Sequence, residues 1–353
     1  MAFQIQNLPT DTHEAVYRWE NETLGVVGFI AIHSTALGPA FGGARVWSYA
    51  SEAEALTDAL RLSEGMTYKN AMAELGAGGG KAVLWTRRPL TAREEIFTCF
   101  GEAIDLLRGR YITAEDVGTG VADMQVVRQK TRYVAGLPAS EGQAGGDPSP
   151  WTALGVMSAV EAALAIDGQE VRGMTFAVQG LGSVGRRLCA LLHGAGAKLI
   201  VADTFVGRAE EAADEFGATI CGSEFLLGAR ADVLVPCALG GILNARTIPE
   251  IKARYVIGAA NNQLATAADG HTLAHRGITY VPDYVANAGG IINVLAEYRG
   301  HDDQEVEHDV RHIGSRVDAL LRRARVADEP PFEVARKMAQ DLIAAGAKNS
   351  AMA

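Results

Sequence analysis

The sequence lacks the long uncharged apolar run that a membrane-spanning helix needs. No window approaches about 18 consecutive apolar residues. The first twenty residues also lack a basic segment followed by an apolar stretch, which would mark a secretory signal. We therefore expect a cytoplasmic protein that has no membrane partner.

Cysteine is scarce and scattered along the chain. The four residues are Cys99, Cys189, Cys221 and Cys237. They form no CxxC pair and have no histidine nearby at ligand spacing, so the pattern argues against a disulfide framework and against a zinc site. We expect buried free thiols and no metal.

Positive charge is in deficit. The 353 residues include 32 basic and 42 acidic ones, which gives a net charge of −10, and no cluster of lysine and arginine is present. This excludes nucleic acid as a partner, because binding to a phosphate backbone needs such a cluster. Hydrophobic residues at 48% and charged residues at 21% are typical of a globular chain, and the length predicts about two domains.

The pattern of apolar residues divides the chain. Residues 26–33 form a β-branched apolar run, and residues 52–69 have helical periodicity, so the first part mixes strands and helices. The segment PASEGQAGGDPSP at 138–150 predicts a connector. Beyond it, helix-length segments alternate with short apolar runs, which predicts βαβ units and a parallel sheet. The runs are 174–178, 198–202, 232–235, 255–257 and 279–281, after a helix predicted over 151–166.

The predicted architecture is therefore α/β, with two domains flanking a cleft. Residues 1–146 would form a mixed α/β domain for substrate binding, catalysis and oligomerisation. Residues 147–292 would form a Rossmann dinucleotide-binding domain. The helix-rich residues 293–353 would bridge back to the first domain.

A glycine motif carries the dinucleotide prediction. Gly180, Gly182 and Gly185 form GxGxxG between a predicted strand and a predicted helix, and Ser183 and Val184 lie within it. The glycines permit a tight turn, a close approach of pyrophosphate and close packing of helix on strand. Asp203 follows 23 positions after Gly180, near the spacing of a carboxylate that binds ribose hydroxyls. Because the next residue, Thr204, is neutral and no arginine adjoins it, we expect NAD rather than NADP.

A second glycine-rich segment must be distinguished from a nucleotide site. Residues 76–81, GAGGGK, superficially resemble a phosphate-binding loop. A Walker A motif, however, needs Gly five places before its Gly-Lys pair and Ser or Thr after it, and Leu75 and Ala82 occupy these places. We therefore exclude a nucleoside triphosphate site and interpret the segment as a backbone that delivers Lys81 into a site.

Two lysines and one aspartate are candidates for chemistry. Lys69 and Lys81 lie in apolar or glycine-rich settings, where loss of solvation lowers a lysine pKa and makes the amine usable as a base. Asp116 lies in TAEDVGT. Each residue alone is more often an ordinary surface or loop residue, so the prediction depends on their combination.

Taken together, these segments resemble the glutamate, leucine, phenylalanine and valine dehydrogenase superfamily, and within it the leucine dehydrogenase branch. The resemblance covers nearly the whole chain. The segments that carry it are 38–45, 58–62, 65–69, 79–81, 113–119, 147–150, 180–185, 236–241, 258–264, 282–284 and 287–290.

The resemblance implies reversible oxidative deamination of an L-amino acid to a 2-oxo acid and ammonium with reduction of NAD. It implies that Lys81 is the general base, that Asp116 exchanges protons with the amine, and that Lys69 binds the substrate carboxylate. The other substrate residues that it implies are Phe41, Gly42, Met66, Ala114, Asn287, Ile291 and Val294. The cofactor residues that it implies are Thr152, Gly180, Gly182, Ser183, Val184, Gly185, Asp203, Ala238 and Asn262.

The resemblance also leaves alternatives for the substrate and for the function. These substrate positions are mostly apolar and include no cation to pair with a second carboxylate, which favours leucine, valine or isoleucine over glutamate. Phe41 replaces the leucine typical of the branch, so phenylalanine or tryptophan is the alternative substrate. A NAD-binding sensor without turnover is an alternative of another class, whereas no histidine lies in the setting that a 2-hydroxy-acid dehydrogenase needs. The resemblance further implies a homo-oligomer, from dimer to octamer.

Overall fold

The computed structural model describes residues 4–86, 92–139 and 142–352, so residues 140–141 of the predicted connector lie outside it. The chain divides into two compact units. Unit 1 comprises residues 1–146, 294–303 and 339–353, and unit 2 comprises residues 147–293 and 304–338. The boundaries between the units fall inside the last helices, so the C-terminal segment belongs partly to each unit. The domain limits read from the sequence stay a prediction.

Unit 1 is built around a mixed sheet, whose described strands run in the order β1-β2-β3-β6-β4-β7 with β5 paired to β6. Strands β1, β2, β3 and β6 pair in antiparallel fashion, whereas β4 and β5 pair with β6, and β4 with β7, in parallel. The strands are β1 (Gln4–Leu8), β2 (Ala15–Asn21), β3 (Val26–Ser34), β4 (Ala40–Phe41), β5 (Ala44–Trp47), β6 (Gly78–Thr86) and β7 (Tyr111–Ile112). The helices before residue 147 are α1 (Glu52–Met72), α2 (Arg93–Asp105) and α3 (Val121–Arg128).

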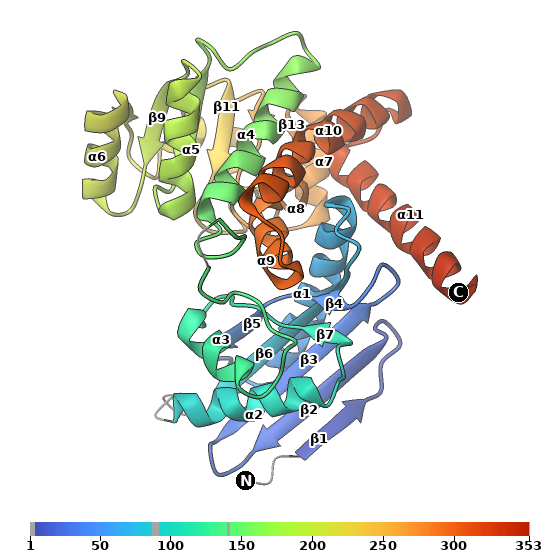
Figure 1. Cartoon of the computed structure of the whole chain (residues 1–353). Coiled ribbons are helices and arrows are strands. Elements are labelled where there is room, and N and C mark those ends of the chain that lie inside the picture. Colours follow the sequence, from blue (N-terminus) through green and yellow to red (C-terminus); the bar gives the residue numbers. More distant parts are fainter. Residues whose placement is uncertain (1–3, 87–91, 140–141, 353) are drawn as a thin grey trace. The chain divides into compact units, whose positions relative to one another are not determined.

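Strand β3 is apolar from Val26 to Ile32 because both of its faces are covered. Ile30 and Ile32 belong to the core cluster that contains Phe97 and Phe100 of α2. The alternate residues Val27, Phe29 and Ala31 pack in a second cluster with Ala55 and Ala59 of α1. Helices α1 and α2 therefore lie on opposite faces of the sheet, and Figure 1 shows α2 crossing one of them. An unbroken apolar run is typical of a strand that is buried on two sides.

Unit 2 contains a parallel sheet in the order β10-β9-β8-β11-β12-β13. Numbered along the chain, this is the strand order 3-2-1-4-5-6 of the doubly wound dinucleotide-binding fold. The strands are β8 (Thr175–Gln179), β9 (Lys198–Ala202), β10 (Thr219–Ile220), β11 (Val233–Pro236), β12 (Tyr255–Val256) and β13 (Thr279–Tyr280). All five predicted strands are present, each shifted by at most one or two residues.

Helices precede, connect and follow these strands, and α4 and α5 pack side by side (Figure 1). They are α4 (Ser149–Ala165), α5 (Ser183–Gly194), α6 (Val206–Phe216), α7 (Ala267–His275) and α8 (Asp283–Ala286), with 3-10 turns at Leu226–Gly228 and Ile248–Glu250. The chain then continues through α9 (Gly289–Arg299), α10 (Asp303–Ala327) and α11 (Pro331–Met352). No helix within the described residues is both long and apolar enough to cross a bilayer.

The cysteines follow the prediction in part. All four are free thiols, and Cys99 and Cys189 are buried as expected. Cys221 and Cys237 are only partly buried, so the prediction was wrong for them. Both lie directly after strands, where the chain leaves the sheet.

Candidate active site

Lys81 lies in the middle of unit 1, on β6. Its neighbours Ala82 and Leu84 face the α2 side of the sheet, while Val83 faces the α1 side. Because side chains alternate along a strand, Lys81 shares the face of Val83 and α1. It is only 4% exposed. A lysine at such a position needs an anion, since an unpaired buried charge is costly.

Asp116 provides that anion. The Lys81 Nζ lies 3.0 Å from Asp116 Oδ2. Asp116 belongs to the loop that follows β7, and Thr119 fixes this loop: the Thr119 hydroxyl accepts a hydrogen bond from the Asp116 amide at 2.8 Å and donates one to the Ala44 carbonyl at 2.9 Å. Gly43 allows the loop to lie close, because a Cβ there would be 2.5 Å from the Glu115 carbonyl oxygen. The structure therefore brings together the two residues predicted for catalysis.

Arg45 joins this pair, and sequence reasoning assigned it no role. From β5, its Nε donates to the same Asp116 Oδ2 at 2.9 Å, and its Nη1 donates to Asp58 Oδ2 on α1 at 3.0 Å. Asp58 also accepts from the Tyr49 hydroxyl at 2.6 Å and from Arg61 at 2.8 Å. The signal available in the sequence was the position of Arg45, two residues after the glycine pair at 42 and 43. This position lies on the short strand β5.

The electrostatics of the cluster suit a base. Burial lowers the pKa of Lys81, and the Arg45 charge lowers it further, against the opposing effect of Asp116. Burial would raise the pKa of Asp116, but Lys81 and Arg45 outweigh it and hold that pKa below its usual value. Asp116 thus stays ionised, while Lys81 can lose its proton at a lower pH than an ordinary lysine.

The residues predicted to bind substrate lie in both units. Lys69 is in the last turn of α1, half-buried. The neighbouring Asn70 amide donates to the carbonyls of Phe41 and Gly78, at 3.2 and 2.6 Å, which ties this end of α1 to β4 and β6. Phe41 is fully buried on β4. Unit 1 also holds Gly42, Met66, Ala114 and Val294, whereas unit 2 holds Asn287 and Ile291.

The glycine motif of unit 2 forms the expected turn between β8 and α5. Gly180 has φ +90°, and a Cβ there would be 2.8 Å from the Ala238 Cβ, so two predicted cofactor residues are neighbours. Gly182 caps α5 in an extended conformation, and Ser183, Val184 and Gly185 form its first turn. Nothing lies within 4 Å of the position of a Cβ on Gly182. A cavity of about 560 Å³ opens beside this turn. The helix N-terminus therefore has room for a phosphate group.

Asp203 lies just beyond β9 and beside the glycine turn. Its carboxylate accepts from the amides of Leu181 and Phe205 at 2.7 and 2.8 Å. Burial would raise its pKa, yet these two amides hold that pKa below its usual value. An ionised carboxylate at this place suits ribose hydroxyls.

The sequence predicted no arginine beside this site, but the structure places one there. Arg208, four residues after Thr204 on α6, brings its Nη1 to 3.7 Å from Asp203 Oδ2. Its guanidinium also lies over the Phe205 ring. Arg208 is not adjacent to Asp203 in the sequence, but it lies in the first turn of α6, which begins directly after the bend at residues 204–205.

The predicted cofactor residues Thr152 and Asn262 and the predicted substrate residue Asn287 also belong to unit 2. The Thr152 hydroxyl donates to the Pro148 carbonyl within the first turn of α4. The Asn262 backbone N–H donates to the Asp283 carboxylate at 2.9 Å. The Asn287 side chain donates to the Ala259 carbonyl and to Asn261 at 3.0 and 2.8 Å, and its own oxygen is buried without a partner in the described structure.

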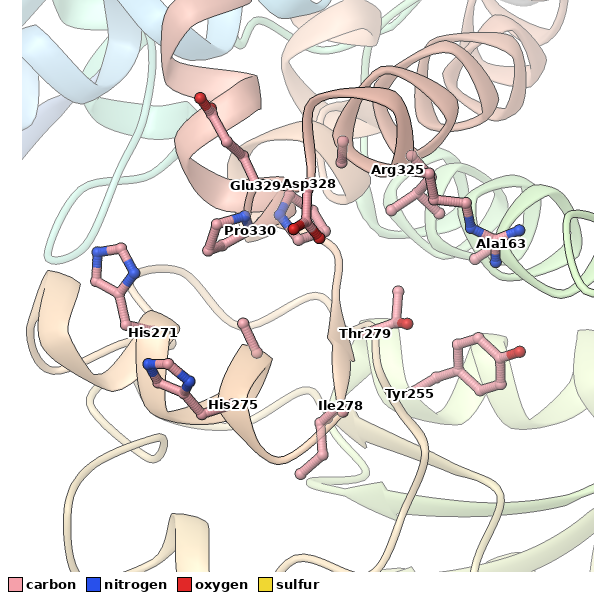
Figure 2. Close-up of a pocket in the computed structure, with 15 residues that line it drawn as sticks. Ala163, Tyr255, His271, His275, Ile278, Thr279, Arg325, Asp328, Glu329 and Pro330 are labelled. Carbon is pink, nitrogen blue, oxygen red and sulfur yellow. The ribbon is translucent and has the colours of Figure 1, made fainter.

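A further cavity of about 550 Å³ in unit 2 has no part in this arrangement (Figure 2). It is lined by residues such as Tyr255 and Thr279, the first residues of β12 and β13, and by His271 and His275 of α7. It therefore lies at the amino ends of these strands, whereas dinucleotides bind at the carboxyl ends.

Comparisons with known proteins identify the family of the chain. Residues 10–133 match the model of the Glu/Leu/Phe/Val dehydrogenase dimerisation domain. Residues 147–208 and 204–319 match the model of glutamate/leucine/phenylalanine/valine dehydrogenase.

Individual relatives match over nearly their full lengths. Leucine dehydrogenase of Geobacillus stearothermophilus is 44% identical over 95% of this chain and 92% of the relative. L-tryptophan dehydrogenase of Nostoc punctiforme is 41% identical over 94% and 93% of the two chains. The crystal structure of the Nostoc punctiforme L-tryptophan dehydrogenase superposes with a TM-score of 0.85, covering 96% of this chain and 97% of the other.

Proposed function

The chain belongs to the Glu/Leu/Phe/Val dehydrogenase family, and from this premise we propose that it catalyses NAD-dependent, reversible oxidative deamination of an apolar L-amino acid. The family makes it an amino-acid dehydrogenase that uses a nicotinamide dinucleotide. The observation that carries the proposed chemistry is the buried Lys81–Asp116 pair, in which the lysine has a lowered pKa.

The cofactor residues fit NAD. Gly180, Gly182 and the first turn of α5 would hold the pyrophosphate, and Asp203 would accept hydrogen bonds from the adenosine ribose. A nicotinamide cofactor held by these residues would supply the acceptor for the hydride of the substrate α-carbon. Asp203 disfavours NADP because its ionised carboxylate would repel a 2′-phosphate, although Arg208 lies near enough to soften that repulsion.

The residues of unit 1 would supply the acid and base chemistry. Lys69 would bind the substrate carboxylate as a cation and so fix the orientation of the α-carbon. Neutral Lys81 would take the proton of the water that adds to the iminium carbon. Asp116, held ionised by Lys81 and Arg45, would exchange protons with the amine that leaves.

An aliphatic substrate is favoured over an aromatic one. The leucine dehydrogenases among the relatives are 42–44% identical to this chain. Phe41 is fully buried and lies beside Gly42, where a Cβ would come within 3.2 Å of Met66 Cγ. The bulky Phe41 side chain would shorten the pocket that receives the substrate side chain. The tryptophan dehydrogenase, at 41% identity, supports the alternative of an aromatic substrate.

The assembly would be a homo-oligomer built through the first domain. This proposal is supported by the match of residues 10–133 to a dimerisation domain. The oligomeric state can be measured directly from the mass of the purified protein in solution.

The test of function is NADH formation with a panel of L-amino acids. We expect turnover with leucine, valine or isoleucine, and loss of that turnover in Lys81→Ala. Lys252→Ala, which removes an exposed lysine from a loop of unit 2, is the matched control and should keep full turnover. Preference for phenylalanine or tryptophan would favour the aromatic alternative. NAD binding without turnover on any amino acid would overturn the enzyme proposal and leave a sensor.

A further inference from the structure

The exposed face of α10 carries two histidines and an aspartate that no step of the proposed reaction uses. His308 and His312 are four residues apart, and Asp309 lies between them. The ligand atoms of all three residues lie within 4.8 Å of one another, and within the described residues no other group of three histidine, cysteine or acidic side chains meets this condition. The sequence prediction of no metal missed this group because it considered only histidines near cysteines.

We propose that His308, Asp309 and His312 bind one divalent late first-row transition-metal ion, such as Zn²⁺. Residues four apart on a helix lie on one face, which is why two histidines at this spacing can share one ion. Two imidazoles and one carboxylate suit Zn²⁺, Cu²⁺ or Ni²⁺ better than Mg²⁺ or Ca²⁺, which prefer oxygen ligands alone.

The hydrogen bonding of His312 prepares it as a ligand. Its Nδ1 lies 3.0 Å from the backbone carbonyl oxygen of His308. A carbonyl oxygen can only accept, so Nδ1 carries the proton and Nε2 carries the free lone pair. Metal-binding histidines commonly donate their other ring N–H to such a carbonyl, which fixes the tautomer and the ring orientation.

The spacing of the rings requires only a small adjustment. The centroids of the His308 and His312 rings are 4.4 Å apart. Zinc binds imidazole nitrogen at about 2.0–2.1 Å, so two ligand nitrogens must lie roughly 3–4 Å apart. Both histidines are exposed and Asp309 is half-buried, so rotation of the side chains can close the remaining distance without moving the helix.

The surrounding charges favour a cation. The first ten residues of α10 include Asp303, Glu305, Glu307 and Asp309 but a single arginine. That arginine, Arg311, donates to Glu307 at 2.7 and 2.9 Å. It is thereby directed to Glu307 and does not neutralise Asp309.

The direct test is calorimetric titration of the full-length protein with zinc chloride. We expect one zinc ion per chain in the wild type. His308→Ala and His312→Ala should each weaken binding at least tenfold, and the double variant should abolish it. Asp309→Asn should weaken binding less than either histidine variant, because the amide keeps an oxygen that can bind the ion, whereas alanine removes the ligand atom altogether.

The matched control is His275→Ala, which removes an exposed histidine of α7 in the same unit. It should bind zinc as the wild type does. Cobalt(II) gives a second readout, since its visible spectrum reports the ligands, and the spectrum should change in His312→Ala but not in the control. Absence of zinc binding in the wild type, or equal binding in the double variant, would overturn the proposal. This result is independent of the dehydrogenase test, because α10 contributes no residue to the proposed catalytic cluster.

Discussion

Arg45 offers the sharpest test of how the cluster around Lys81 works. Arg45→Gln removes one positive charge that donates to Asp116 at 2.9 Å and to Asp58 at 3.0 Å. Asp58 keeps its bonds from Tyr49 and Arg61, whereas Asp116 keeps only Lys81 as a cationic partner among the ion pairs described. The change therefore acts mainly on the catalytic pair.

The expected effects have a sign and a size. Arg45 lowers the pKa of Lys81 because the two cations repel, so its removal raises that pKa. A neutral base is then available only at higher pH. We also expect the rate to fall about hundredfold, since a displaced catalytic group can cost that much. Loss of stability should be about 1.5–3 kcal/mol, between the values for exposed and buried ion pairs, because the Arg45 side chain is 21% exposed.

The assay is kcat/KM for the amino acid as a function of pH, with urea unfolding in parallel. The rising limb should move to higher pH in Arg45→Gln. Arg45→Lys keeps the charge but loses the fork that reaches two carboxylates, so it should lower the rate with a smaller shift of the limb. Arg61→Gln is the matched control, because Arg61 contacts the other oxygen of Asp58 and has no contact with Asp116 among the bonds described. The reasoning would be refuted if Arg45→Gln kept the rising limb of its pH profile at the wild-type pH and its kcat/KM within twofold of wild type.

Three further predictions follow from other contacts. Asp116→Asn removes the anion that raises the pKa of Lys81, so the rising limb of the pH profile should move to lower pH. The rate should also fall about hundredfold. A rising limb at the wild-type pH would contradict this prediction. Asp203→Asn removes the negative charge beside Arg208, and the ratio of kcat/KM with NADP to that with NAD should rise at least tenfold in paired assays; an unchanged ratio would show that Asp203 does not select the cofactor. Phe100→Ala removes a fully buried ring from the α2 core and should reduce the free energy of unfolding by about 3–5 kcal/mol in urea titration, whereas a loss under 1 kcal/mol would mean that this core can collapse around the gap.

Much of the fold could be predicted from the sequence because the signals are local. The unbroken apolar run of β3 indicates a strand covered on both faces, and the structure shows α1 and α2 covering it. The motif from Gly180 to Gly185 determines a turn. Gly180 has φ +90° and lies close to the Ala238 backbone, and glycine adopts such a conformation with no steric cost. The spacing from this motif to Asp203 likewise depends on one helix and one strand, α5 and β9.

Tertiary structure alone decided which charges meet. Lys81, Asp116, Arg45 and Asp58 come from β6, a loop, β5 and α1, and no sequence spacing specifies that one carboxylate oxygen accepts from both Lys81 and Arg45. The lowered pKa of Lys81 follows from this meeting and from burial, neither of which a sequence displays. The histidine pair on α10 shows the same at shorter range, because a helical turn brings together residues four apart in the chain. Arg208 lies beside Asp203 because α6 begins directly after the bend that follows Asp203.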